Sequence, residues 1–181
     1  MSLKNIKVIA FDADDTLWVN ETFFRAAEEE FCDLLEEYLP KEEANKLLFD
    51  VEMRNLPLYG YGIKPFTLSL IEAAIEVSKG KVTIELIEKL IVKGKEMLNH
   101  PIELIDGIEH TLAELSKKYR LVVATKGDLL DQERKLIKSG LEPYFHHIEI
   151  VSDKKEKQYA KLVKHLDVTS DEFLMVGNSL K

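Results

Sequence analysis

The 181-residue sequence contains a single cysteine, Cys32, so no disulfide can form within the chain, and a reducing compartment is indicated. No apolar run approaches the roughly 20 residues of a membrane-spanning helix, and the N-terminal MSLKNIK has no apolar segment of signal-peptide length. Excess basic charge is also missing: 33 acidic residues outnumber 25 basic ones, for a net charge of -8. These absences predict a cytoplasmic protein with no membrane and no nucleic-acid partner. They leave its oligomeric state open.

Hydrophobic residues make up 45% of the chain, which is enough for a packed core. Four short apolar runs read as buried strands, and amphipathic helices separate the last three of them. The expected strands are residues 8–11, 121–124, 148–151 and 173–176. We expect Asp106 and Asp128 to begin helices as N-caps and Gly140 to end one. This alternation is typical of a doubly wound parallel sheet in an α/β fold.

The segment between the first two strands has helical periodicity and no strand pattern. We expect one helix to end near Pro40 and a second to stop before a turn-rich loop at 55–62. A third should start at Pro65 and reach Gly80, and a fourth should be capped by Thr83. The sequence thus predicts a Rossmann-like core domain from residues 1–17 and 102–181, with an all-helical cap domain, residues 18–101, inserted after the first strand.

Each expected strand stops at polar residues. Acids beginning with Asp12 follow the first strand, and the hydroxyl of Thr125 follows the second. Lysines beginning with Lys154 follow the third, and an amide with a hydroxyl, beginning at Asn178, follows the fourth. Carboxyl ends of parallel strands share one edge of a sheet, so these side chains should converge there. Neighbouring carboxylates favour a bound cation, or a proton on one of them.

These segments resemble the four motifs of the haloacid dehalogenase-like superfamily, over the whole chain and in the same order. FDADDTLW resembles the first, VVATKGD the second, SDK with Tyr159 the third and MVGNS the fourth, while Asp106-Gly107 resembles the return from a cap to the core. The resemblance implies a hydrolase with a helical lid. Within the family, Asp14 favours phosphoryl transfer over carbon–halogen cleavage, since a halide leaves without needing a proton. A phosphatase of small phosphorylated metabolites is therefore expected, with a phosphomutase as the alternative.

The resemblance also implies roles for individual residues. Asp12 is the nucleophile and Asp14 the general acid/base. Thr125, Lys126 and Lys154 bind the phosphoryl group, with Lys157 an alternative to Lys154. Asp12, Asp14 and Asn178 hold Mg²⁺, Asp14 through its main-chain carbonyl.

Two features depart from the family pattern. Asn178 stands where an acid is usual, and the chain stops at Lys181, before a further Asp of the fourth motif. The sequence therefore looks like part of a longer protein. An amide oxygen binds Mg²⁺ more weakly than a carboxylate, so a relative that binds a ligand without turnover is a further alternative. A signalling receiver phosphorylated on Asp is another, although receivers lack so large a helical insertion.

For several other residues a structural role, and not a functional one, is the simpler interpretation. Cys32 fits the apolar side of a helix. His146 and His147 have no Cys or acid at ligand spacing in the sequence and are expected to be structural. The segment Tyr59–Gly62 lacks the context of a nucleotide-binding loop. Trp18 either gates the site or packs at the base of the cap.

Overall fold

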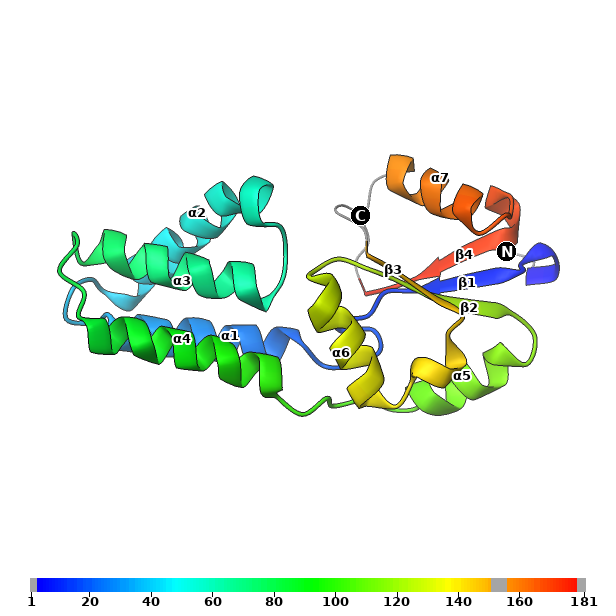
Figure 1. The fold of residues 1–181 in the computed structure, drawn as a ribbon, viewed down its shortest axis with the longest axis horizontal. Coiled ribbons are helices and arrows are strands. Elements are labelled where there is room, and N and C mark those ends of the chain that lie inside the picture. Colours follow the sequence, from blue (N-terminus) through cyan, green and yellow to red (C-terminus); the bar gives the residue numbers. More distant parts are fainter. Residues whose placement is uncertain (1–2, 151–155, 179–181) are drawn as a thin grey trace. The chain divides into compact units, whose positions relative to one another are not determined.

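The computed structural model describes residues 3–150 and 156–178. The chain divides into two compact units, Met1–Asn20 with Pro101–Lys181, and Glu21–His100. We call the first the α/β unit and the second the helical unit. Figure 1 shows the elements of each.

The α/β unit is built on a four-stranded parallel sheet in the order β3-β2-β1-β4. The strands are β1 (Val8–Phe11), β2 (Arg120–Thr125), β3 (His147–Ile150) and β4 (Phe173–Val176). All four residues of β1 and five of the six in β2 are buried, as their apolar runs predict. The predicted α/β class with a parallel sheet is confirmed.

Helices cover both faces of this sheet (Figure 1). Helices α5 (Ile108–Ser116) and α6 (Leu129–Ser139) pack on one face and α7 (Glu156–His165) on the other. Alternate residues of the strands supply the two cores: Ile9 and Phe11 join the α5/α6 side, whereas Val8 and Ala10 join the α7 side. Short 3₁₀ helices at Leu3–Asn5, Glu142–Tyr144 and Ser170–Glu172 complete the unit.

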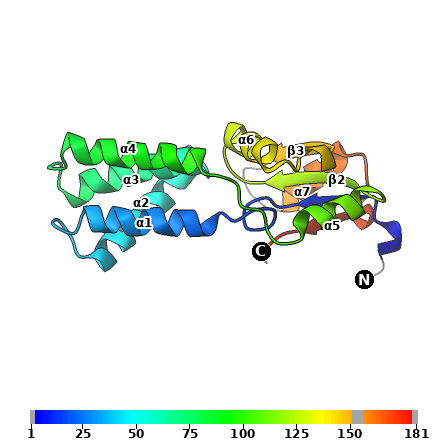
Figure 2. The same cartoon turned by 90° about the horizontal axis from the view of Figure 1, so that it is seen from below.

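The helical unit contains α1 (Glu21–Leu34), α2 (Lys41–Tyr59), α3 (Ile63–Val77) and α4 (Ile84–Asn99), seen together in Figure 2. Helix α3 packs against α2 and α4, and α1 packs against the same two helices. Their apolar sides enclose one hydrophobic cluster, which includes Cys32. No strand occurs among the described residues of this unit, as predicted.

The predicted loop at 55–62 is wrong in its first half, because α2 continues through Tyr59 despite Pro57 inside the helix. Packing overrides the local signal. The buried Asn55 side chain donates hydrogen bonds to Ser69 Oγ (3.1 Å) and Glu72 Oε2 (2.9 Å) of α3, and the Tyr59 hydroxyl donates to Glu72 Oε1 (2.9 Å). These bonds hold the last turn of α2 against α3 and help to offset the main-chain hydrogen bond that Pro57, which has no N–H, cannot make.

Helix ends were predicted with mixed success. Thr83 caps α4 by accepting a hydrogen bond from Leu86 N (3.2 Å), and Asp128 caps α6 by accepting one from Asp131 N (3.1 Å), as predicted. Gly140 ends α6 in the left-handed conformation, also as predicted. The Asp106 cap is wrong: Gly107, at φ 76°, holds that position and no side chain caps α5. Helix α3 starts at Ile63, two residues before Pro65, and ends at Val77, short of Gly80.

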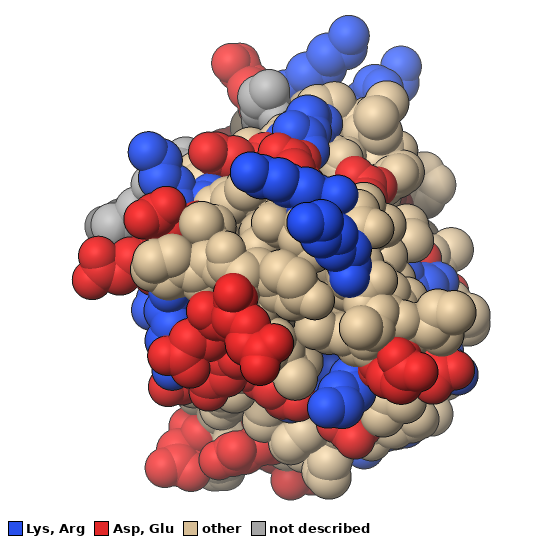
Figure 3. Space-filling model, turned by 90° about the vertical axis from the view of Figure 1, so that its left-hand side faces the viewer, with Lys and Arg blue, Asp and Glu red and all other residues tan. Residues whose placement is uncertain are grey.

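Charges of both signs lie on the surface. On the face drawn in Figure 3, acidic side chains form one large group and also lie in several smaller ones, some of them beside basic side chains. This face presents no continuous basic tract for a nucleic-acid backbone. No helix in the described part of the chain combines the length and apolarity needed to cross a bilayer.

Candidate active site

Asp12 lies at the carboxyl end of β1, where the strand leaves the sheet. It is only 6% exposed, and its main-chain N–H donates to the Val176 carbonyl of β4 (2.8 Å). Its Oδ1 accepts a hydrogen bond from Ala13 N (2.9 Å). The carboxylate is therefore oriented by its own loop at the middle of the sheet edge, between the ends of β2 and β4.

The loop that follows β1 turns sharply. Thr16 N and Leu17 N both donate to the Ala13 carbonyl, and Asp15 adopts a left-handed conformation with φ 56°. Asp15 Oδ1 accepts from Asn20 N (2.9 Å), which ties down the end of the loop. An acidic residue tolerates this conformation better than most because its short side chain can bond locally to the main chain.

Three donors hold the carboxylate of Asp14. Its Oδ1 accepts from Trp18 Nε1 (2.9 Å) and from Lys135 Nζ (3.0 Å), and its Oδ2 accepts from Gln132 Nε2 (2.8 Å). Trp18 is only 1% exposed and so serves as a buried hydrogen-bond donor to this carboxylate. The remaining two donors lie on α6, more than a hundred residues further along the chain.

Sequence reasoning missed Gln132 and Lys135. Helix α6 buries Asp131, Gln132 and Lys135 while leaving Leu129 and Ile137 exposed. A helix that packs on a sheet normally buries apolar residues and exposes polar ones, whereas α6 does the reverse at these positions. Polar residues at spacings of three and four were the available signal, but without knowledge of the buried side they read as a solvent-facing stripe.

Lys135 links several groups of this network. Its ammonium also donates to Asn20 Oδ1 (2.9 Å) and lies 3.7 Å from Asp131 Oδ2. Burial raises the pKa of Asp131, an effect that Lys135 opposes and the negative charge of Asp14 reinforces. One cation therefore serves two carboxylates within a poorly solvated region.

Thr125 is the last residue of β2 and Lys126 follows it, next to the end of β1. Thr125 is 1% exposed, and its hydroxyl donates to the Lys126 carbonyl (3.2 Å). Gly127 has a φ of 127°, and a Cβ there would lie 3.0 Å from Gln132 Nε2. Glycine therefore lets this loop turn tightly against Gln132, which also donates to the Lys126 carbonyl (3.1 Å).

Tyr159 of α7 also belongs to this neighbourhood. Burial raises the pKa of its phenol, the nearby charge of Asp12 adds to the rise, and Lys126 opposes it. Asp12, Lys126 and Tyr159 thus lie within electrostatic range of one another. In the sequence Tyr159 served only as a spacing marker for the third motif.

Asn178 lies at the end of β4, beside β1, and its main-chain N–H donates to Thr16 Oγ1 (3.1 Å). Gly177 precedes it, and a Cβ at that position would lie 3.1 Å from Asp12 Cβ and 3.6 Å from Asp12 Oδ2. The structure thereby brings the ends of β1, β2 and β4 together. Lys154 lies outside the described residues, and Lys157 is exposed on the first turn of α7.

The residues at this edge fit a magnesium ion in their chemistry. Mg²⁺ prefers oxygen ligands, and the buried carboxylate of Asp12, with space kept open by Gly177, is such a ligand. Asn178 offers an amide oxygen. The carboxylate of Asp14 is already engaged by three donors, so its main-chain carbonyl oxygen is the ligand it can offer.

Comparisons with known proteins agree on one family. A model of the haloacid dehalogenase-like hydrolase family matches residues 6–181. The N-acylneuraminate-9-phosphatases of Mus musculus and Homo sapiens are 28% and 26% identical over 192 residues, covering all of this chain and 77% of each enzyme. A haloacid dehalogenase-like family hydrolase from Xanthomonas campestris is 40% identical, with a TM-score of 0.92 over 97% of this chain and 74% of that one. A HAD phosphatase from Thermococcus onnurineus shares the fold at 22% identity and a TM-score of 0.62, over 97% and 78% of the two chains.

Proposed function

Because this chain belongs to the haloacid dehalogenase-like hydrolase family, we propose that it is a Mg²⁺-dependent phosphatase of small phosphorylated metabolites. The reaction runs through a phosphoryl group carried on Asp12. The observation that carries the proposal is the pair of carboxylates after β1: Asp12 is oriented by main-chain groups, and Asp14 is held by Trp18, Gln132 and Lys135.

In the first step, a carboxylate oxygen of Asp12 attacks phosphorus, and the bond from phosphorus to the leaving oxygen breaks. Asp14 gives its proton to that oxygen, so the product leaves as a neutral alcohol. Lys135 lies 3.0 Å from Asp14 Oδ1 and stabilises the carboxylate that results. Bound Mg²⁺ supplies positive charge against the phosphoryl oxygens.

In the second step, Asp14 takes a proton from a water molecule, which attacks phosphorus and releases inorganic phosphate. The carboxylate of Asp12 and the proton on Asp14 are restored, so the cycle balances. The Thr125 hydroxyl and the main-chain N–H groups of Lys126 and Gly127 donate to phosphoryl oxygens, and Lys154 adds positive charge.

Asp14 separates this function from its alternatives. Carbon–halogen cleavage releases an anion that needs no proton, whereas an alkoxide leaving from phosphorus does. Three donors, one of them a cation, fix the Asp14 carboxylate in one orientation, as a general acid/base requires. Names of relatives add support: two curated relatives are N-acylneuraminate-9-phosphatases.

Hydrolysis of an aryl phosphate by the full chain with Mg²⁺ tests the proposal. We expect Asp12→Asn to lower kcat by about 10³-fold or more, since the amide cannot act as the nucleophile. Asp106→Asn, which changes an exposed acid of the same unit, is the matched control and should stay within about two-fold of wild type. Wild-type turnover by Asp12→Asn would refute the proposed nucleophile.

A second measurement identifies the intermediate. Asp14→Asn should slow turnover by about 10²- to 10⁴-fold, and acid-quenched protein should then carry one phosphoryl group on the peptide that contains Asp12. A panel of phosphate monoesters that includes N-acylneuraminate 9-phosphate defines the substrate. Halide release from a 2-haloacid without phosphate release would favour the dehalogenase alternative.

A further inference from the structure

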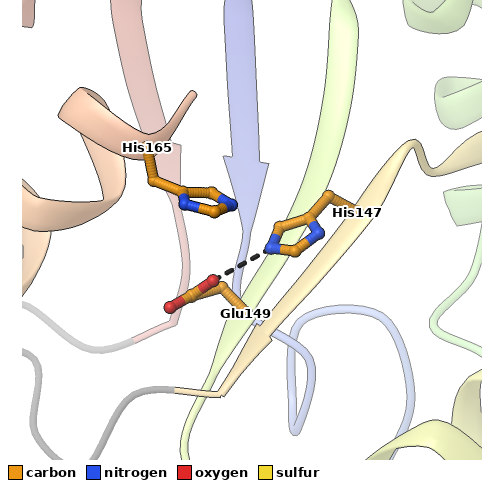
Figure 4. A group of neighbouring side chains, drawn as sticks. All are labelled: His147, Glu149 and His165. Carbon is orange, nitrogen blue, oxygen red and sulfur yellow. Dashed lines mark hydrogen bonds and ion pairs between the residues drawn. The ribbon is translucent and has the colours of Figure 1, made fainter. Parts of the chain in front are cut away.

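A second group of metal-binding side chains lies on the sheet face covered by α7. His147, Glu149 and His165 each place one ligand atom within 4.8 Å of the other two (Figure 4). His147 Nε2 and Glu149 Oε2 are already 2.9 Å apart, and the two imidazole rings have their centroids 5.4 Å apart. All three residues belong to the α/β unit.

The fold explains this convergence. His147 and Glu149 are two residues apart on β3, so their side chains point to the same face of the sheet. His165 is the last residue of α7, which packs on that face through Leu162. The spacing in the sequence does not indicate a metal site here, because the third ligand, His165, comes from a helix that begins after β3 has ended.

The group shares no residue with the candidate active site, and it lies on β3 and α7, with β2 between β3 and β1. Helix α7 returns from the carboxyl end of β3 toward the start of β4, so its last residue lies near the beginnings of the strands. The Arg120 side chain, at the start of β2, donates to the Leu166 carbonyl just after α7. Glu149 pairs with Ala124, next to Thr125, so β3 lies along the carboxyl half of β2, and β2 separates the group from β1 and Asp12.

We propose that His147, Glu149 and His165 form a binding site for a borderline-soft divalent cation, with Zn²⁺ the best match. Two imidazoles and one carboxylate are ligands that Zn²⁺ takes in three-ligand protein sites, with a solvent molecule in the fourth position. Mg²⁺ prefers six oxygen ligands, so this site would not compete for it.

The geometry requires one small adjustment. A tetrahedral Zn²⁺ with bonds of about 2.0–2.1 Å keeps its ligand atoms roughly 3.3 Å apart. His147 and Glu149 are already closer than this, and His165 is exposed, so its ring can rotate toward them without disturbing the core. The bound ion would join the edge strand β3 to the end of α7 and stabilise that part of the sheet.

Zinc titration of untagged, chelator-treated full-length chain, against a competing chromophoric chelator, tests the site. The titration is also done on the Asp12→Asn variant, which removes a carboxylate of the candidate active site. We expect one equivalent of Zn²⁺ to bind, Co²⁺ to give the visible absorption of a four-coordinate site, and Zn²⁺ to raise the unfolding temperature. His165→Ala should weaken Zn²⁺ binding by at least about 10- to 100-fold, a loss seen even when only the partner of a ligand is removed.

The matched control is His146→Ala, since His146 is exposed and adjacent to His147 but precedes β3 and is not one of the three clustered side chains. It should leave the affinity unchanged. Glu149→Gln keeps a hydrogen-bonding group beside His147 and should still lose affinity, which separates metal binding from simple packing. Equal Zn²⁺ affinity in wild type and His165→Ala, or binding abolished by Asp12→Asn alone, would overturn the proposal.

Discussion

The ammonium group of Lys135 makes the positioning of Asp14 dependent on a residue 121 positions away. Its side chain is 11% exposed, and that of Asp131 beside it is 4% exposed. Two carboxylates share this cation, and water has little access to the one on Asp131. Removing one partner of such a buried group leaves an uncompensated charge, which costs far more than losing an exposed ion pair.

Lys135→Met should therefore destabilise the α/β unit and impair catalysis together. We expect a loss of about 3 kcal/mol in the free energy of unfolding and a fall in kcat with little change in KM, because the lysine positions Asp14 rather than binding substrate. Denaturant unfolding and steady-state kinetics measure the two effects. Lys138→Met, an exposed lysine on the same helix, is the control and should change neither. Adding Asp131→Asn to Lys135→Met should restore part of the stability but not kcat; an unchanged kcat in Lys135→Met would contradict the positioning role.

Glu52 provides a pH-dependent prediction in the helical unit. It lines a cavity of about 140 Å³ with Phe24 and Phe66, and burial together with the charge of Glu28 raises its pKa from 4.5 to about 7. The folded state therefore holds this proton more tightly than the unfolded state. The resulting stabilisation is present at acid pH and is lost as the pH rises from about 4.5 to about 7.

Glu52→Gln should remove this dependence. At pH 8 the variant should be more stable than wild type by on the order of 1 kcal/mol, after allowance for partial solvent exposure, and near pH 4.5 the two should be equal. Urea unfolding across this pH range measures the difference. Glu88→Gln, an exposed acid of α4, should follow wild type throughout; a Glu52→Gln difference that does not vary with pH would exclude the proposed cause.

Among the elements, strands were predicted more faithfully than the roles of helix residues. Continuous apolar runs locate β1, β2 and β4 because burial on both faces leaves a local signature. The caps Thr83 and Asp128 are local as well. By contrast, the extension of α2 beyond Asn55 depends on bonds to α3, and the contacts of α6 with Asp14 span 118 and 121 positions. Local patterns carry no information on such contacts, so the ends of the strands indicated Asp12 and Asp14 but not the residues that hold Asp14.

Packing between α3 and α4 gives a prediction at the scale of elements. Gly94 of α4 is buried, and a Cβ there would lie 2.2 Å from Thr67 Oγ1 and 2.8 Å from Thr67 Cγ2. Alanine favours a helix by up to about 1 kcal/mol over glycine, but overpacking typically costs about 1–3 kcal/mol. We expect Gly94→Ala to lower the unfolding temperature of the helical unit, and adding Thr67→Ala to recover part of the loss because it removes both of these atoms. Stabilisation by Gly94→Ala alone would show that the two helices are not in close contact here.

At the scale of the whole chain, each unit has hydrophobic clusters of its own. The cluster around Leu70, which is fully buried on α3, consists of residues of the helical unit, and the clusters that include Leu112 of α5 and Leu162 of α7 consist of residues of the α/β unit. Substitutions that leave a cavity act first on the side chains around the cavity. Local stability can thus differ between the two units, as expected for cooperative units that open separately.

Leu70→Ala should therefore reduce amide protection within α1 to α4 by the equivalent of about 2–5 kcal/mol and leave β1 and β2 protected. Leu112→Ala should have the opposite effect, with the loss confined to the α/β unit. Hydrogen–deuterium exchange resolved by peptide measures both variants against wild type under identical conditions. If either substitution lowered protection equally throughout the chain, the two units would unfold as one. In that case stabilising the sheet, for example by zinc at His147, Glu149 and His165, would also protect α1 to α4.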